Sequence, residues 1–141
     1  MFPHPARPSL KEYNRILWFE VPQEVHTSHF LVIQWDGWVL NGAAWTDEFL
    51  SLDYIGAPWP WHADLRVGNG GFSLRSMALA QFIFVQAHQY PVADQEDEAL
   101  CRTHRLSLEK RAGLKWAPLE LAQRFSIEHG AVPPFQDVRI S

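Results

Sequence analysis

The spacing of apolar residues near the start of the chain predicts a helix. Ser9 and Glu12 stand at the separation of a capping box, in which two side chains accept hydrogen bonds from backbone amides of the first turn. We therefore expect the helix to begin near Leu10, and apolar residues recur at helical intervals as far as Leu17. Proline lacks an amide hydrogen and clashes with the preceding turn, so Pro22 is expected to end this helix or to break it.

An unbroken apolar run over residues 29–35 predicts the first strand. Such a run is typical of a strand that is buried on both faces, as in the centre of a sheet. The run ends at Asp36 and Gly37, which would then lie at the carboxyl edge of that sheet. A second short strand is expected over residues 53–56, ahead of a loop rich in proline and tryptophan at 57–64.

The rest of the chain alternates between the same two patterns. We expect helices over residues 76–87, 96–110 and 118–125, a short helix from Asn41 to Phe49, and short strands over residues 114–117 and 126–128. The predicted fold class is α/β, a single domain with a mixed sheet and flanking helices. An extended arm over residues 1–9 precedes this domain, which spans residues 10–130, and a tail over residues 131–141 follows it.

Length, composition and charge narrow the class of protein. A chain of 141 residues with 47% hydrophobic side chains is the size of one globular domain with its own core. The formal net charge is −4 and the 12 basic residues are scattered, which argues against a nucleic-acid partner because phosphate backbones need clustered Lys and Arg. A single cysteine allows no internal disulfide, the N-terminus lacks the apolar core of a signal peptide, and no apolar run approaches the length of a membrane span. We expect a soluble, cytoplasmic protein.

Seven tryptophans are the unusual feature of the composition, and five of them fall between residues 35 and 61. Indole rings bury large areas in a core, and they also stack on the C–H faces of sugar rings. Both interpretations stay open at this point: a cluster of core or wall residues, or a surface that binds carbohydrate.

Asp36 is the first candidate for chemistry, because ligands of open α/β sheets bind where buried strands end. A carboxylate at this place could hold Mg²⁺ or Mn²⁺, and such an ion neutralises a diphosphate. The alternative is an aspartate that only starts the turn at Gly37.

Two later segments offer further candidates. Residues 68–71 carry three glycines, so exposed backbone N–H groups could face a sugar or a phosphate beside Arg75, or the glycines could only form a tight turn. Glu96 and Asp97 open a predicted helix. One of them could act as a general base that takes a proton from an acceptor hydroxyl, or both could only favour the helix start electrostatically.

Four segments taken together resemble a known family. In order along the chain they read VIQWDGWVLN, AWTDEFLSLDYIGAPWPW, VGNGGFSLRS and EDEALCRTHR…GLKWAPLELAQRFSIE. They are similar to a bacterial and fungal group of domains of unknown function that is regarded as glycosyltransferase-like and related to the GT-A fold. The resemblance covers roughly Leu10 to Glu128, and four blocks in one order make it specific.

This resemblance implies the C-terminal part of a GT-A fold and the transfer of a sugar from a nucleotide-sugar donor to an acceptor hydroxyl. Asp36 would lie near Mn²⁺ or Mg²⁺ and the donor diphosphate, and Glu96 or Asp97 would supply the catalytic base. The residues that we expect to bind substrate are Trp59, Trp61, Asn69, Gly70, Gly71 and Arg75.

The chain also departs from the family pattern. Gln34 stands where the first aspartate of the usual Asp-x-Asp motif is expected, and no histidine follows Phe135. Members usually carry a further βαβ-type unit ahead of the segment that begins at Tyr13, and in a GT-A fold that unit holds much of the nucleotide. Two alternatives to an active transferase therefore stand: a truncated, non-catalytic remnant that binds carbohydrate or a partner protein, and a purely structural fragment. A truncated domain could self-associate through exposed strand edges or take the missing part from a partner chain.

Overall fold

The first helix begins where the capping box predicts. The computed structural model describes residues 8–92 and 94–128, and in it α1 spans Leu10–Arg15. The Ser9 hydroxyl accepts a hydrogen bond from the Glu12 amide at 3.2 Å, and the Glu12 carboxylate accepts one from the Ser9 amide at 2.8 Å. The predicted arm over residues 1–9, apart from its last two residues, lies outside the described part of the chain, as does the predicted tail.

The prediction that Pro22 ends or breaks this helix is wrong. A π-helical turn, η1 (Ile16–Glu20), continues α1, and α2 (Val21–Glu24) follows directly. Pro22 therefore lies in the first turn of α2, where a missing amide hydrogen costs little. The wider π-turn, closed by a hydrogen bond from the Val21 amide to the Ile16 carbonyl, starts a new helical register just before the proline.

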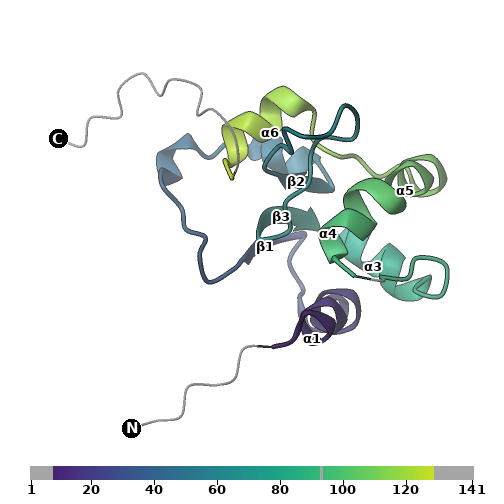
Figure 1. Ribbon diagram of the computed structural model, residues 1–141. Coiled ribbons are helices and arrows are strands. Elements are labelled where there is room, and N and C mark those ends of the chain that lie inside the picture. The colour runs from purple at the N-terminus through teal and green to yellow at the C-terminus, as the bar shows by residue number, and fades with distance from the viewer. Residues whose placement is uncertain (1–7, 93, 129–141) are drawn as a thin grey trace, which may run out of the picture.

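Three antiparallel strands form the sheet at the centre of Figure 1. The strand β3 (Phe72–Ser76) lies between β1 (His29–Ile33) and β2 (Tyr54–Gly56). Leu74 faces both neighbours, with Leu31 on one side and Ile55 on the other. The α/β class is confirmed, but the predicted mixed sheet is not, because the three strands pair antiparallel.

Two of the predicted strands do not form. Among the described residues, parallel pairing is confined to a single bridge between Tyr54 and Trp116, which is all that remains of the strand expected over residues 114–117. Residues 126–128 have no strand pairing either. Residues 114–117 lie in a short connection between two helices, which leaves too few residues to add a full strand to the sheet.

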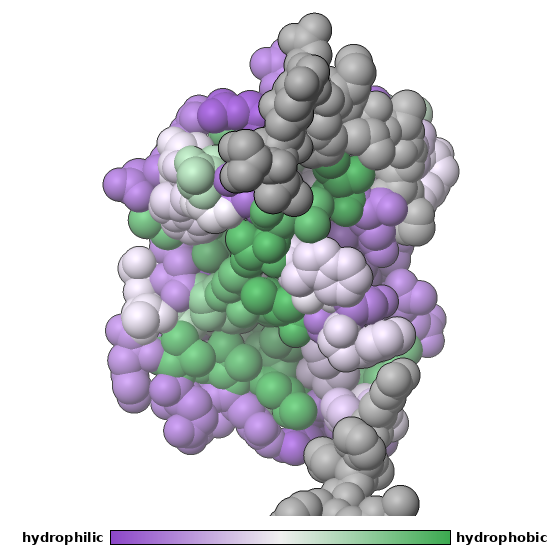
Figure 2. All heavy atoms as spheres, turned by 90° about the vertical axis from the view of Figure 1, so that its left-hand side faces the viewer, coloured by the Kyte–Doolittle hydropathy of each residue, from purple (hydrophilic) through white to green (hydrophobic). Residues whose placement is uncertain are grey.

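The prediction that the first strand is buried on both faces is also wrong. Among the described residues β1 pairs only with β3, so it is an edge strand of this sheet, and Leu31 and Ile33 are 40% and 47% exposed. Val32 points the other way and is buried. Exposed apolar side chains continue into the next segment at Trp38 and Leu40, and Figure 2 shows an apolar region on the corresponding side of the molecule.

The remaining helices agree with the sequence pattern in place, though not always in type. The short helix expected from Asn41 to Phe49 is two 3-10 turns, which Asn41 and Thr46 cap. The run expected over residues 96–110 is helical, with a π-turn in its middle. The bounds of these elements are η2 (Gly42–Ala44), η3 (Asp47–Ser51), α3 (Met77–Val85), α4 (Glu96–Glu98), η4 (Ala99–Thr103), α5 (Arg105–Ala112) and α6 (Leu119–Phe125).

The main core lies between the sheet and the group of helices α3, α4 and α5 (Figure 1), with Trp18, Tyr54 and Leu108 among its buried members. A smaller cluster around Phe49 and Leu121 joins α6 to the other end of the sheet. None of the described helices is both long enough and apolar enough to cross a lipid bilayer.

Cys101 should be inert toward thiol reagents in the folded protein. Its thiol is fully buried and accepts a hydrogen bond from the Trp116 indole at 3.4 Å. Burial raises its pKa to about 12, so almost no reactive thiolate forms at neutral pH. We expect negligible modification by an aromatic disulfide reagent in buffer and complete modification in concentrated guanidinium chloride. Rapid labelling in buffer would contradict the burial of this side chain.

Candidate functional site

The glycine turn, formed by residues 68–71 just ahead of β3, is the structural centre of the candidate site. Asn69 in this turn has a positive φ of 57°, in the left-handed region that asparagine tolerates better than most residues. Its side-chain oxygen accepts a hydrogen bond from the Gly71 amide at 3.1 Å, which fixes the turn. Gly70 must lack a side chain, because a Cβ atom at this position would collide with the Glu96 carboxylate. The glycines therefore permit close contact with α4 as well as forming a turn.

A buried ion pair joins β3 to α4 beneath this turn. The two terminal nitrogens of the Arg75 guanidinium donate to the two carboxylate oxygens of Glu96 at 2.7 and 2.9 Å. The same guanidinium also donates to the Ser73 hydroxyl at 2.9 Å and to the Gly70 carbonyl at 3.3 Å. Both charged side chains are only 3% exposed. Burial acts to lower the pKa of Arg75, but the adjacent Glu96 outweighs it and holds that pKa above its ordinary value, so the guanidinium stays charged.

Asp97, the next residue along α4, is held against the other side of the glycine turn. Its Oδ2 atom accepts a hydrogen bond from the Gly70 amide at 3.1 Å, and its Oδ1 atom accepts one from the Glu98 amide at 2.9 Å. Each oxygen keeps a lone pair. Asp97 is half-buried and lies in the wall of a pocket of about 240 Å³. Of the two adjacent carboxylates, Glu96 is fully engaged in its ion pair with Arg75. Asp97 is the one whose oxygens can still accept a hydrogen bond from a ligand.

Polar side chains dominate the wall of this pocket. Three of them are carboxamides, three are carboxylates and one is a phenol. The described lining residues are Leu10, Tyr13, Gln34, Asn69, Gly70, Gly71, Gln95, Glu96, Asp97 and Glu128. They come from α1, from the residue that follows β1, from the glycine turn, from α4 with the residue before it, and from the segment after α6, so elements far apart in the sequence converge at the pocket.

The Tyr13 hydroxyl is an unsatisfied group in this wall. It is buried and makes no hydrogen bond within the described structure. Burial is the main cause that raises the pKa of Tyr13 above its ordinary value, and the charge of Glu96 acts in the same direction, whereas Arg75 and the Gln34 amide oppose it. The hydroxyl therefore stays protonated at neutral pH. A buried polar group without a partner is uncommon, and a bound molecule or an ordered water is the usual explanation.

Both helical runs that reach the pocket contain a π-turn shortly after their pocket residues. The turn η1 follows Tyr13 in α1, and η4 follows Asp97 in α4. π-Turns inside helices are rare and occur frequently at functional sites. Their presence in both runs is therefore independent support for a functional pocket here.

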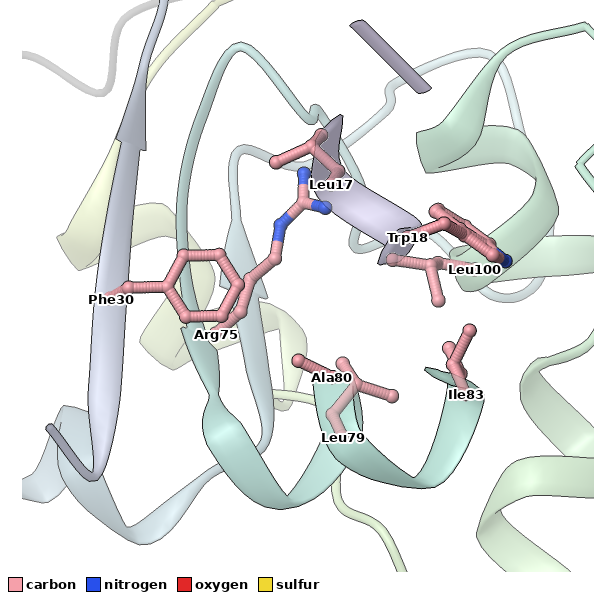
Figure 3. A pocket seen from close by; sticks show the side chains of 8 residues that line it. All are labelled: Leu17, Trp18, Phe30, Arg75, Leu79, Ala80, Ile83 and Leu100. Atoms are coloured by element: carbon pink, nitrogen blue, oxygen red, sulfur yellow. The ribbon is translucent and has the colours of Figure 1, made fainter. Parts of the chain in front are cut away.

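A second cavity lies on the other side of Arg75 and is too small to be a ligand site. Its volume is about 20 Å³, and Figure 3 shows Arg75 beside Phe30, with its guanidinium directed toward Leu17. Arg75 is the only charged or polar side chain in a lining that is otherwise apolar. A buried water needs about two to four polar partners, so this space does not favour even a single water molecule.

The structure brings together some of the predicted site residues. Asn69, Gly70, Gly71, Glu96 and Asp97 share the pocket wall. Arg75 lies beneath it with its guanidinium hydrogen-bonded to protein groups rather than open to the pocket.

The two tryptophans predicted to bind substrate lie beside the glycine turn rather than in the pocket lining. Trp59 is 4% exposed and its ring occupies the space that a Gly68 side chain would need. Trp61 stacks on Trp59, with ring centroids 6.4 Å apart, and is 57% exposed. Of the five tryptophans between residues 35 and 61, only Trp59 is buried, so they do not form a core cluster.

Asp36 lies apart from the pocket. It is exposed in the turn after β1 and is not among the lining residues. Within residues 8–92 and 94–128, no three His, Cys, Asp or Glu side chains gather closely enough to hold a metal ion. The described residues around Asp36 therefore do not by themselves fit a protein-held Mg²⁺ or Mn²⁺ site, and His129 and Asp137 lie outside the described range.

The chain matches, over residues 2–136, the family described as "Protein of unknown function (DUF5672)". It belongs to this family. The match confirms a domain of unknown function, while the predicted relationship to glycosyltransferases stays a prediction. No curated protein and no solved structure matches this DUF5672 domain.

Sequence reasoning missed five of the described pocket residues, which are Leu10, Tyr13, Gln34, Gln95 and Glu128. Tyr13 belongs to a set of apolar residues at helical spacing, and this pattern indicates only a position in the core. Gln95 stands before a predicted helix, where a polar residue is common and gives no sign of a site. Gln34 was visible as the residue that replaces an expected aspartate. The signal that would have placed Gln34 is its position one residue beyond β1. There its backbone N–H donates a hydrogen bond to the Gly71 carbonyl at 2.8 Å.

Replacing Gly70 with alanine should destabilise this DUF5672 domain by about 1–3 kcal/mol, the usual cost of an overpacked site. The new methyl group would collide with the Glu96 carboxylate and approach an Arg75 nitrogen to 3.1 Å. Urea denaturation measures the effect. Gly42→Ala is the matched control, since no atom lies within 4 Å of its added methyl group, and it should change stability by less than about 0.5 kcal/mol. Equal losses in the two variants would contradict the close contact at Gly70.

Proposed function

We propose that this domain is glycosyltransferase-like and transfers a sugar from a nucleotide-sugar donor to an acceptor hydroxyl, with Asp97 as general base. The observation that carries the proposal is the half-buried Asp97 carboxylate in the wall of a polar pocket, fixed by the amides of Gly70 and Glu98. A general base must be held rigidly within hydrogen-bonding reach of its substrate, and two backbone hydrogen bonds supply that rigidity. The resemblance of the four sequence segments to glycosyltransferase-like domains supports the same choice.

The proposed step is a single displacement. An acceptor hydroxyl donates a hydrogen bond to Asp97, its oxygen attacks the anomeric carbon of the donor sugar, and its proton passes to the carboxylate. The bond from the anomeric carbon to the diphosphate oxygen breaks, and the nucleoside diphosphate leaves with that electron pair. Because attack and departure take place on opposite faces of the sugar, the configuration at the anomeric carbon is inverted.

The other residues of the site act by positioning. Glu96 holds Arg75, and Arg75 holds the Gly70 carbonyl, while the Gly70 amide holds Asp97. This chain of contacts ties the base to the centre of the sheet. The metal at Asp36 that the resemblance implies has no supporting cluster among the described residues, so no part of the proposed step is assigned to it.

A second candidate is a non-catalytic module that binds carbohydrate or a partner protein. The absence of Lys and Arg from the described pocket lining favours it, because a donor diphosphate needs cationic partners. The open edge of β1 supports the related idea that the domain self-associates or binds a chain that supplies a further part. A buried, unpaired cysteine is compatible with the reducing cytoplasm as the place of action.

Thermal unfolding with ligands tests the proposed function. The protein is heated with UDP-hexoses, with GDP-hexoses and with free hexoses, each in the presence and absence of Mn²⁺. A ligand at 100 times its dissociation constant should add about 2.7 kcal/mol of stability, a shift of several degrees for a domain of this size. Shifts with both a hexose and a nucleotide-sugar, followed by transfer between them, support the transferase. A shift with a hexose alone favours the carbohydrate-binding module. No shift with any of them contradicts the transferase and the carbohydrate-binding module, and leaves the module that binds a partner protein as the favoured candidate.

A further inference from the structure

The charges in the pocket wall are unbalanced. Glu96 is neutralised by Arg75, and both are buried. Asp97 has no cationic partner among the described residues, since both of its oxygens accept only from backbone amides. No Lys, Arg or His belongs to the described lining. Among the described lining residues, the negative charge of Asp97 therefore has no cation beside it, and an anionic ligand would meet like charge there.

Neutral hydrogen-bonding groups fill much of the remaining wall. The carboxamides of Gln34, Asn69 and Gln95 can each donate and accept, as sugar hydroxyl groups do. The Asn69 oxygen is used by the Gly71 amide, which leaves its side-chain NH₂ group available, since it makes no hydrogen bond to any described residue. The buried Tyr13 hydroxyl next to Gln34 is a further donor without a partner. A set of this kind satisfies several hydroxyl groups of one ligand at once.

We propose, on the basis of the function above, that this pocket takes an uncharged sugar as the acceptor and excludes anionic sugars and phosphates. The donor diphosphate is then held outside the pocket, and only the acceptor hydroxyl reaches Asp97. Gln34 is the specificity-determining residue that can be tested most directly, because it is exposed and belongs to the pocket lining. A cation introduced at this position would offset the negative wall.

The test measures binding of D-glucose, D-galactose and D-mannose and of the corresponding uronic acids by calorimetry. The unaltered protein should bind at least one hexose about tenfold or more tightly than its uronic acid, as expected when an unpaired carboxylate meets like charge. Gln34→Lys should reduce this preference by about fivefold or more. Gln123→Lys is the matched control, because it adds the same charge at an exposed position of α6 outside the pocket lining, and it should leave the preference unchanged.

The outcomes separate this inference from the function on which it rests. If hexose and uronic acid bind equally well, or if the preference is unchanged in Gln34→Lys, the proposed selection by charge is overturned. Sugar binding by the pocket would remain supported in both cases. A complete lack of hexose binding overturns both. An equal change of preference in Gln34→Lys and Gln123→Lys assigns the effect to overall charge and also overturns the proposal. Comparable melting temperatures of the two variants ensure that binding, not folding, is compared.

Discussion

Replacing Arg75 with methionine should lower the free energy of unfolding by about 3–5 kcal/mol, because it leaves the buried Glu96 carboxylate without its cation. Glu96 is 3% exposed and cannot recover the lost interaction from water. The Gly70 carbonyl and the Ser73 hydroxyl lose a donor as well. For a domain of ordinary stability this is a large fraction of the total, and urea denaturation monitored by tryptophan fluorescence measures it.

Two further variants make this prediction specific. Arg124→Met removes an exposed arginine whose contact with Glu48 is 3.6 Å long, and it should cost less than about 1 kcal/mol. The double variant Arg75→Met with Glu96→Leu removes both charges, so it should recover much of the stability lost in Arg75→Met alone. A loss of less than about 1 kcal/mol in Arg75→Met would show that water reaches the pair, in conflict with the burial described above.

Replacing Asp97 with asparagine should lower the rate of sugar transfer by about 10²–10⁴-fold if the carboxylate is the general base. Asparagine has nearly the same shape and can still accept a hydrogen bond from the Gly70 amide, but it cannot take the acceptor proton. The loss should fall on kcat, with little change in KM for the acceptor. Steady-state kinetics of transfer to the hexose that binds best measures both.

Glu98→Gln provides the control for this second prediction. It makes the same change of charge one residue further along α4, on a side chain that is 45% exposed and lies 3.6 Å from the His62 ring. Its kcat should stay within about threefold of the unaltered protein, since it does not line the pocket. Equal losses in the two variants would point to a general effect of charge or folding and would remove Asp97 from the role of base.

Local signals in the sequence predicted the elements whose causes are local. The capping box at Ser9 marks the start of α1, and residues 53–56 and 76–87 contain β2 and α3 nearly as expected. The same reasoning found the glycine turn and the acidic pair as separate candidates. Their contact, through Arg75 and Glu96, joins residues 21 positions apart, and no local pattern reports it.

The errors share a physical cause. An apolar run such as residues 29–33 shows that a strand is present, but whether it lies at the centre or the edge depends on which other strands pair with it. Likewise, the sequence of a tryptophan cluster does not show whether its side chains are buried or exposed, because this depends on which segments pack over them. Of the five tryptophans between residues 35 and 61, only Trp59 is buried. The π-turns escaped prediction because the hydrogen bond that defines them has no characteristic residue.

The π-turns also constrain the number of residues in the two helical runs that contain them. Each contains one residue more per turn than the α-helix around it, so η1 and η4 fix how Tyr13 and Asp97 are oriented relative to the buried residues that follow them. Deleting one residue from either turn would allow a regular α-helix, yet it would rotate the pocket residue by about 100° around the helix axis. Homologous chains are therefore expected to keep the number of residues in these turns, and to gain or lose residues only in connections such as the one between α3 and α4.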